Sequence, residues 1–233
     1  MNTEKQIKGN DGQPGGNQGQ AADIADIADI AGKTKGRLIV VSGPSGVGKG
    51  TVLSELFKMS DEFVYSVSAT TRQPRQGEID GVNYFFKTRA DFEKMISEKG
   101  LLEYAEYNGN YYGTPKSYTD IMREKGKHVI LEIEVQGAMK VKALCPDALM
   151  IFIAPESKQV LHERLRSRGT ESEQVIASRT AIAEKELRAC LLYDYITVNR
   201  AGMAKKCAAD ILSIVRADAL RASKQFSVAA EFI

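Results

Sequence analysis

The chain has 233 residues and a formal net charge of +2, and 43% of its residues are hydrophobic and 27% charged. These ordinary values predict a globular protein of one good-sized domain, and the bulk charge gives no indication of nucleic-acid binding. The three cysteines are widely spaced and argue against a disulfide framework, and no apolar run approaches the roughly 18 residues of a membrane span, so we expect a cytoplasmic protein without membrane partners.

The N-terminal residues differ in composition from the rest of the chain. They include the Gly/Gln/Asn-rich stretch GNDGQPGGNQGQ and the repeated triplet of ADIADIADIA. Isoleucines that are three residues apart form no steady stripe along a helix. We therefore expect residues 1–36 to be a disordered tail without a catalytic role, and residues 37–233 to form the domain.

After the tail, apolar runs alternate with helical patterns. The runs RLIVVSG, HVILEIEV, ALMIFIA and YITVN predict strands at 37–43, 128–135, 148–154 and 195–199. Helices are expected at 51–59, from about Ser157, after the capping box of Thr170 and Glu173, and over about 204–224. This alternation predicts an α/β fold with a mostly parallel sheet.

Residues 65–118 interrupt this alternation. They are rich in Tyr, Thr, Arg and Gly, and they contain short alternating stretches such as VNYFF and one capped helix, TRADFEKMISEKG. Alternating polar and apolar residues are typical of strands with one solvated face. We expect an antiparallel insert that stands off the parallel core.

The segment GPSGVGKGT matches the phosphate-binding pattern G-x-x-x-x-G-K between a predicted strand and a predicted helix. In this pattern the glycines let the backbone curl, so that successive N–H groups converge on phosphate oxygens. Lys49 is expected to reach the β- and γ-phosphates. Position 50 is Gly where the pattern has Ser or Thr, so the metal-binding hydroxyl is missing there, and Thr51 follows. The predicted ATP-binding residues of the segment are Gly43, Pro44, Ser45, Gly46, Val47, Gly48, Lys49, Gly50 and Thr51.

A second anion site is predicted around Arg72 and Arg75, which flank Pro74 on a Thr- and Gly-rich turn. Two guanidinium groups on a rigid turn can grip one phosphate group. By itself, the same pair would favour a solvated surface pair of charges.

Three segments downstream of GPSGVGKGT carry a specific resemblance: SVSATTRQPRQGE, LLEYAEYNGNYYGTP and LEIEVQGA. In this order and spacing they resemble the guanylate kinases, P-loop nucleoside monophosphate kinases that phosphorylate GMP with ATP. The resemblance implies an α/β P-loop kinase core, a mostly parallel sheet flanked by helices, with a small mixed or antiparallel GMP-binding insert and a helical lid. It divides the domain into a core (37–64, 119–160 and 181–233), an insert (about 65–118) and a lid (about 161–180).

The resemblance also implies a set of GMP-binding residues. Glu103 matches the carboxylate that reads guanine, whose N1–H and N2 amine are both donors, whereas adenine would present a lone pair and leave a buried polar group unpaired. LEIEVQG departs from the family's L-D-I-D-x-Q-G, so Glu132 and Glu134 are each one methylene longer than the aspartates they replace. The implied GMP-binding residues are Ser68, Arg72, Arg75, Tyr84, Glu103, Tyr112, Thr114, Glu132 and Glu134.

The lid residues follow from ERLRSRG and the helix after it. Arg164, Arg168 and Arg179 match the lid arginines, which together with Lys49 and Arg72 form the implied catalytic set. Arg179 shares roughly one side of its helix with Glu186, so a structural ion pair of these two residues is the alternative for Arg179. Asn199 matches an asparagine near the adenine of ATP, although Arg200 follows it where the family often has acidic residues.

The implied reaction is MgATP + GMP → MgADP + GDP, and dGMP is expected to be an acceptor as well. A phosphate oxygen with a second pKa of about 6 is mostly ionised at neutral pH and needs no general base, so catalysis rests on positioning and charge neutralisation. We expect Mg²⁺, held mainly by phosphates and water, to bridge the β- and γ-oxygens. ATP and GMP are the expected partners, and a homo-oligomer remains open.

Two alternatives remain at this point. Guanylate-kinase-like domains also serve as scaffolds that bind peptides, but those domains erode the phosphate-binding segment that this chain keeps. A different P-loop kinase or NTPase would share GPSGVGKGT, but a generic NTPase needs no second nucleotide pocket such as TTRQPRQGE with Glu103 predicts.

Overall fold

The computed structural model describes residues 35–166 and 173–221, except for the side chains of residues 173–179. At the N-terminal end of the described chain, the Gly36 N–H donates to the carbonyl of Arg123, and Lys35 forms an ion pair with Glu124. The last two residues of the predicted tail are therefore attached to the domain, and residues 1–34 lie outside the described residues.

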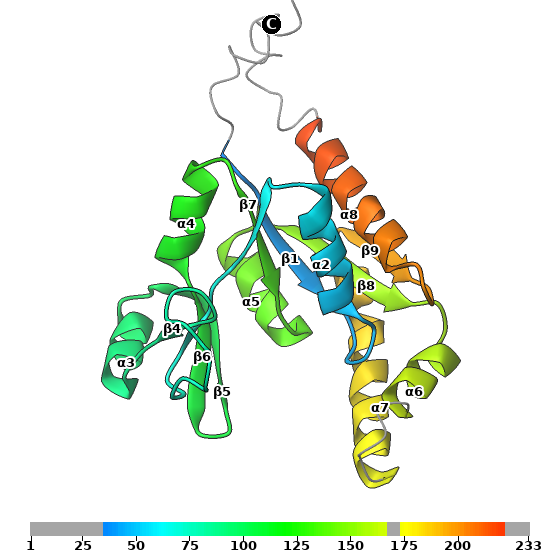
Figure 1. The fold of residues 1–233 in the computed structure, drawn as a ribbon, viewed down its shortest axis with the longest axis horizontal. Helices are drawn as coiled ribbons and strands as arrows, with labels where there is room; N and C mark the ends of the chain where they lie inside the picture. Colours follow the sequence, from blue (N-terminus) through cyan, green and yellow to red (C-terminus); the bar gives the residue numbers. More distant parts are fainter. Residues whose placement is uncertain (1–34, 167–172, 222–233) are drawn as a thin grey trace, which may run out of the picture. The chain divides into compact units, whose positions relative to one another are not determined.

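Parallel strands form the core sheet, in an order that reverses around its central strand (Figure 1). The order is β2 (Phe63–Tyr65), β7 (His128–Glu132), β1 (Leu38–Ser42), β8 (Leu149–Pro155), β9 (Tyr195–Asn199). Ligands of such open sheets bind at the carboxyl ends of the strands, near the point where the order reverses. The expected α/β fold with a parallel sheet is confirmed.

The continuous apolar runs of the strands are explained by burial on both faces of the sheet. In β1, Ile39 and Val41 belong to one core cluster, while Leu38 and Val40 belong to a second cluster on the opposite face. Successive strand residues point to opposite faces, so a strand that is covered on both sides must be apolar throughout.

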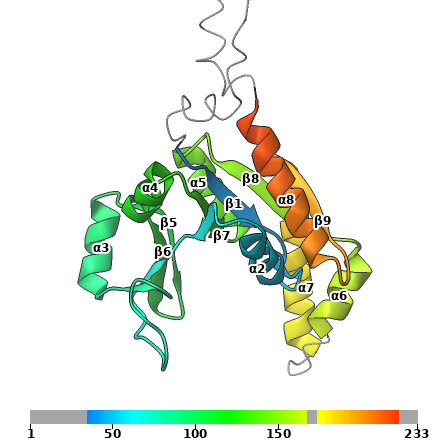
Figure 2. The same cartoon turned by 45° about the horizontal axis from the view of Figure 1, so that its top comes forward.

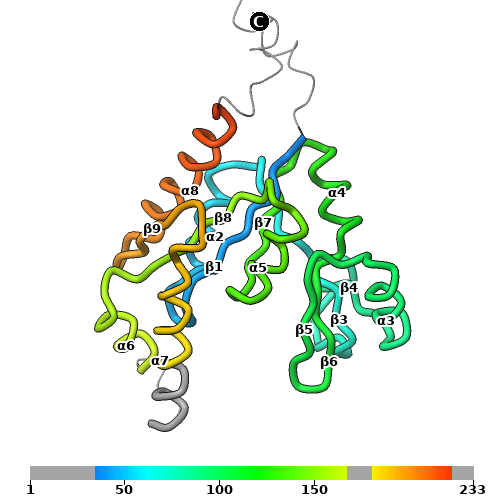
Figure 3. Tube along the Cα trace, turned by 180° about the vertical axis from the view of Figure 1, so that it is seen from behind, coloured from blue at the N-terminus to red at the C-terminus, as the bar shows by residue number. Residues whose placement is uncertain are grey.

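Helices cover both faces. Figure 1 shows α2 and α8 in front of the sheet, and Figure 3, seen from behind, shows α5 and α7 on the other side. The core helices are α2 (Lys49–Met59), α4 (Lys116–Glu124), α5 (Val135–Leu144), α6 (Lys158–Arg166), α7 (Glu173–Arg188) and α8 (Ala204–Ala219), with the 3₁₀ turn η1 (Ala189–Leu192) after α7.

The strand predicted at 128–135 is too long and needs correction. β7 ends at Glu132, and α5 already begins at Val135. The Ile133 N–H still donates to the Val41 carbonyl, and the Ser42 hydroxyl donates to the Ile133 carbonyl at 2.7 Å. The chain thus turns away from the sheet directly after its last pairing with β1, and this turn directs Glu134 to the carboxyl edge.

The insert forms a second sheet that contains both parallel and antiparallel pairs. Its order is β4 (Phe85–Phe86), β3 (Ala69–Thr70), β6 (Asn110–Pro115), β5 (Leu101–Tyr107), and α3 (Arg89–Ser97) packs on it. The Thr88 side chain caps α3 by accepting from the Asp91 N–H, as the sequence predicts. Figure 2 shows the insert on one side of the core sheet and α6 and α7 on the other.

The predicted division into core, insert and lid has boundaries that fall inside helices. The boundary at 118 lies within α4, the one at 160 within α6 and the one at 180 within α7. Because a continuous helix moves as one body, any relative motion would have to occur at the ends of these helices. The division stays a prediction.

Phe152→Ala should destabilise the protein by about 3–5 kcal/mol, because a buried aromatic side chain is lost and a cavity remains. Phe152 is 0% exposed and meets the ring of Tyr193 edge-on. Leu191→Ala, at an 84% exposed position of η1, is the matched control and should change the free energy of unfolding little. Urea denaturation monitored by circular dichroism measures both, and equal midpoints would contradict the assigned core.

Candidate active site

The phosphate-binding loop (residues 43–48) connects β1 to α2 at the carboxyl edge of the sheet. Gly48 has φ +91°, which favours glycine, and a Cβ there would lie 2.8 Å from Asn199 Nδ2. A Cβ at Gly43 would lie 2.3 Å from the Ile153 carbonyl oxygen of β8. The loop therefore lies too close to β8 and β9 for side chains at these two positions.

The first turn of α2 presents an anion-binding end. The Gly48 N-cap provides no side-chain hydrogen bond to the helix, so the first N–H groups are not capped by a side chain. Lys49 Nζ donates to the Gly43 carbonyl at 2.7 Å, which places its ammonium group over the loop. Free N–H groups, the positive end of the helix dipole and one ammonium group together favour a phosphate ligand.

A cavity of about 560 Å³ lies on the outer side of the loop, and we call it the loop cavity. Val47, Gly48 and Thr51 line it together with Arg164 and Asn199. Asn199 Nδ2 and Arg164 Nη1 both donate to the Val47 carbonyl, at 2.8 and 3.2 Å. Arg164 Nη2 also donates to the Asn199 carbonyl, so α6 and the end of β9 hold the loop from one side.

A second pocket, of about 300 Å³, lies between the insert sheet and the beginning of α5, and we call it the insert pocket. Residues predicted from the resemblance come together here from separate segments of the chain. They are Ser68, Tyr84, Glu103, Tyr112, Glu132 and Glu134.

Glu103 is the carboxylate of the insert pocket with the most defined surroundings. Thr114, which is 1% exposed, donates its hydroxyl to Glu103 Oε1 at 2.8 Å. Burial raises the pKa of the Glu103 carboxyl, and the Thr114 hydrogen bond and the charge of Lys140 lower it in part. A carboxylate held by the hydroxyl and the backbone N–H of Thr114 retains acceptor capacity for a ligand with N–H donors.

The predicted arginine pair lies beside the insert pocket, not among its lining residues. Arg72 Nη2 donates to Glu78 Oε1 at 2.8 Å, and the guanidinium carbon lies 5.4 Å from the centre of the Tyr84 ring. The Arg75 backbone N–H donates to Glu78 Oε2 at 2.7 Å. The Glu78 hydrogen bond raises the pKa of Arg72, and a hydrogen bond with Tyr112 adds to this shift. Glu78 therefore joins the two arginines in one turn.

Glu132 connects the two halves of the site. It ends β7 beside Val41 of β1, and the phosphate-binding loop follows β1 directly. Burial raises the pKa of its carboxyl, and the charge of Lys49 lowers it. A carboxylate of the insert pocket thus lies within electrostatic range of the ammonium group that serves the loop.

Two predicted lid residues cannot be placed in the site. Arg168 lies outside the described residues, and Arg179 belongs to α7 but its side chain is not described. Arg164 lines the loop cavity. The roles of all three arginines therefore remain predictions.

The sequence interpretation did not single out several residues that the structure places at the site. Gln136 and Lys140 line the insert pocket from α5, and Glu78 joins the arginines. Glu78 and Gln136 occur within the quoted segments SVSATTRQPRQGE and LEIEVQGA, which is the only sequence signal for them. Lys140 is one α-helical turn beyond Gln136, and its approach to Glu103 depends on the fold.

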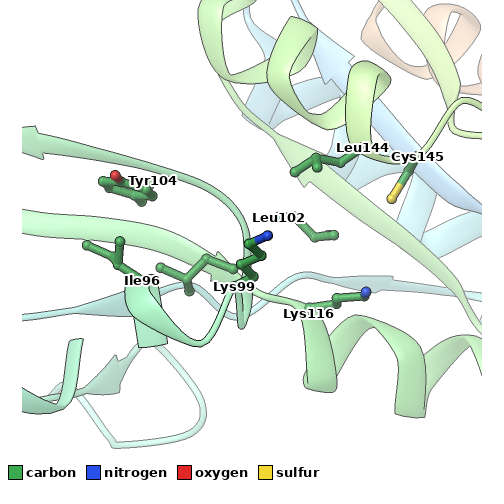
Figure 4. A pocket seen from close by; sticks show the side chains of 8 residues that line it. Ile96, Lys99, Leu102, Tyr104, Lys116, Leu144 and Cys145 are labelled. Carbon is green, nitrogen blue, oxygen red and sulfur yellow. The ribbon is translucent and has the colours of Figure 1, made fainter. Parts of the chain in front are cut away.

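Another pocket, of about 320 Å³, opens behind the insert (Figure 4). Its labelled side chains include Ile96, Lys99, Leu102 and Lys116, and Leu144 and Cys145 reach it from the end of α5. Tyr104 is the only lining residue that it shares with the insert pocket. None of the predicted nucleotide-binding residues lines this pocket, so it does not belong to the candidate site.

In the described part of the chain, no helix is long and apolar enough to cross a membrane.

A glycine-rich phosphate loop and a second polar pocket at one edge of a parallel sheet define a P-loop kinase fold. The guanylate kinase family model matches residues 35–211. A guanylate kinase of Halalkalibacterium halodurans is 55% identical over 167 residues, which cover 72% of this chain and 82% of that protein. A guanylate kinase of Streptococcus agalactiae is 56% identical over 166 residues, which cover 71% and 79%.

The solved structures agree with the sequence comparison. The crystal structure of guanylate kinase from Anaplasma phagocytophilum superposes with a TM-score of 0.61 at 33% identity, covering 81% of this chain and 88% of that chain. This chain belongs to the guanylate kinase family.

Glu103→Gln should stabilise the ligand-free protein at neutral pH. Because folding raises the pKa of this carboxyl, the folded state binds more protons, and the wild-type free energy of unfolding falls as the pH rises through the interval between its unfolded and folded pKa values. The neutral amide lacks this loss, so the advantage of Gln should shrink as the pH is lowered through the same interval. Urea titrations at several pH values measure it, and Glu106→Gln, at an exposed position of the same strand, is the control. Parallel pH dependences of the two variants would contradict the assigned burial.

Proposed function

We propose that this guanylate kinase family member transfers the γ-phosphoryl group of ATP to GMP, forming ADP and GDP, and that it also accepts dGMP. The arrangement of the loop cavity and the insert pocket supports this function most strongly. Both lie at the carboxyl edge of the core sheet, and Lys49, which follows the phosphate-binding loop, is within electrostatic range of Glu132, which lines the insert pocket. A site for two phosphorylated ligands suits a transfer between them better than hydrolysis of one.

On the donor side, the N–H groups of the phosphate-binding loop and of the first turn of α2 would bind the β-phosphate, and Lys49 would turn from the Gly43 carbonyl toward the β- and γ-phosphates. The adenine would occupy the loop cavity beside Asn199, whose buried Oδ1 has no partner among the described residues. An unpaired acceptor there suits the exocyclic amine of adenine.

On the acceptor side, Glu103 would accept from the N1–H and N2 amine of guanine while Thr114 holds its carboxylate. Arg72, Arg75, Tyr84 and Tyr112 would bind the phosphate at the other end. Arg72 already meets the Tyr84 ring and the Tyr112 hydroxyl, so little rearrangement is needed beyond exchange of Glu78 for phosphate oxygens. Charge-assisted hydrogen bonds from arginine suit this exchange.

The chemical step needs no protein base. The acceptor phosphate has a second pKa of about 6 and is mostly ionised at neutral pH. Among the described residues that line the loop cavity and the insert pocket there is no histidine. The remaining tasks are in-line placement of two anions and neutralisation of their charge. The arginines of the lid would contribute to the second task and exclude water when they close.

Mg²⁺ fits this site as an ion held mainly by phosphates and water. No group of three potential ligand residues that could hold a metal occurs in the described part of the chain, and Gly50 offers no hydroxyl. Magnesium keeps several of its waters in such sites. Those waters would be oriented by the hydrogen bonds that they donate to Thr51 at the loop and to the carboxylates of Glu132 and Glu134. The ion supplies neutralisation of the donor phosphates.

An acceptor assay tests the function directly. With ATP and Mg²⁺, the kcat/KM for GMP should be higher than those for AMP, UMP and dTMP by about 10²-fold or more. The reason is that a carboxylate that faces the wrong base edge leaves buried polar groups unpaired. ADP formation is measured by a coupled assay, with each acceptor omitted as the control for hydrolysis. Preference for AMP would overturn the assignment of Glu103.

Two substitutions separate the donor and acceptor halves. Lys49→Ala should lower kcat by about 10²–10³-fold, because charge that develops on the transferring group loses its cation. Arg75→Ala should raise the KM for GMP by about 10–100-fold with a smaller effect on kcat, because a charge-assisted phosphate contact is lost. Lys58→Ala, at the other end of α2 and paired with Glu55, is the control and should leave both parameters unchanged. Unchanged kinetics in the first two variants would contradict the two-site scheme.

A further inference from the structure

The α6–α7 pair packs directly on the phosphate-binding loop. Leu161 and Leu165 of α6 form a buried cluster with Ala183 of α7, and the partly buried Leu187 packs against it. A Cβ at Gly46 would lie 3.0 Å from Leu165 Cδ2, so this cluster is in contact with the loop backbone. The phosphate-binding loop and α7 thus pack against the same leucines of α6.

Glu186 is the polar member of the same face of α7. It comes three residues after Ala183 and directly before Leu187, a spacing that keeps it beside the apolar contacts. Its carboxylate accepts a hydrogen bond from the Ser45 backbone N–H. The second carboxylate oxygen, Oε2, is buried and has no hydrogen-bond partner among the described residues.

The electrostatic surroundings of Glu186 are those of the active site. Burial raises the pKa of the Glu186 carboxyl, the charge of Lys49 lowers it in part, and the charge of Glu134 raises it. Tyr193, which is 8% exposed, lies close enough for Glu186 to raise the pKa of its hydroxyl. A carboxylate in this position costs free energy that an apolar side chain would not, so its contact with the loop calls for a reason beyond packing.

We propose that Glu186 is a positioning residue that ties α7 to the phosphate-binding loop through the Ser45 N–H. This inference rests on the function proposed above. Lys49 begins α2 directly after this loop, so the anchor fixes the loop backbone that leads into the residues proposed to bind the donor phosphates. Glu186 would act through the geometry of the phosphate-binding loop and not through contact with a substrate.

Matched substitutions isolate the hydrogen bond. Gln has the same shape and keeps an oxygen that accepts from Ser45, whereas Met fills a similar volume without such an acceptor. Glu186→Met should lower kcat by about 10–100-fold, because a displacement of about 1 Å is enough for such a loss. Glu186→Gln should stay within about threefold of the wild type. The KM for GMP should change less than kcat does in Glu186→Met, because Glu186 is not among the residues that line the insert pocket.

The control is Glu184→Met on the same helix. Glu184 pairs with Lys158 of α6 at 3.7 Å, a partly exposed ion pair that contributes little, so this variant should match the wild type. Thermal denaturation of the full chain is measured for each variant. A loss of kcat in Glu186→Met that Gln restores, without a matching loss of stability, supports the anchor. Equal losses in the Met and Gln variants, or no loss in either, would overturn it.

A measurement on the wild type keeps the test decisive where Glu186→Met does not fold. Amide exchange without nucleotide should show the Ser45 N–H protected, and Glu186→Gln should preserve that protection. Exchange of the Ser45 N–H at the rate of an exposed amide would overturn the anchor. If the wild type phosphorylates no GMP at all, the proposed function fails; if it does and Glu186→Met has the kcat of the wild type, this inference alone fails.

Discussion

The close approach of the phosphate-binding loop to the strands beside it is the constraint on which the site depends. Side chains at Gly43 and Gly48 would collide with the Ile153 carbonyl and with Asn199 Nδ2. Without them the loop closes tightly over β8 and β9, and α2 starts with its N–H groups at the carboxyl edge of the sheet. Arg164 and Asn199 then secure the loop at the Val47 carbonyl, so the backbone that we propose to bind phosphate is held in place without a ligand.

A transfer between two phosphates requires many cations near one point, and the structure balances them with carboxylates. Glu78 holds Arg72, and Glu132 lies within range of Lys49. In the ligand-free protein these carboxylates partly neutralise the cations, which limits the repulsion among the cations. Exchange of one anion for another costs less reorganisation than ordering unpaired side chains on arrival of the substrate.

Much of the fold followed from local signals. The predicted strand YITVN coincides with β9, because tyrosine and the β-branched residues isoleucine, threonine and valine favour strands. Thr88 caps α3 through Asp91, a contact within one turn. The resemblance located Ser68, Tyr84 and Glu103, and the structure brings them to one pocket. Their individual roles remain predictions, because a shared pocket does not by itself distinguish binding the base from binding the phosphate.

The sequence by itself determined the phosphate-binding loop, since glycine positions and a following lysine are needed wherever that backbone forms. Only the tertiary structure decided where β7 ends, that Lys140 approaches Glu103, and that Glu186 reaches Ser45. Lys140 and Glu103 are far apart in the chain, and so are Glu186 and Ser45. The end of β7 depends on the pairing of this strand with β1. Local preference and periodicity carry no information about such contacts, because they arise only when the sheet brings distant segments to one edge.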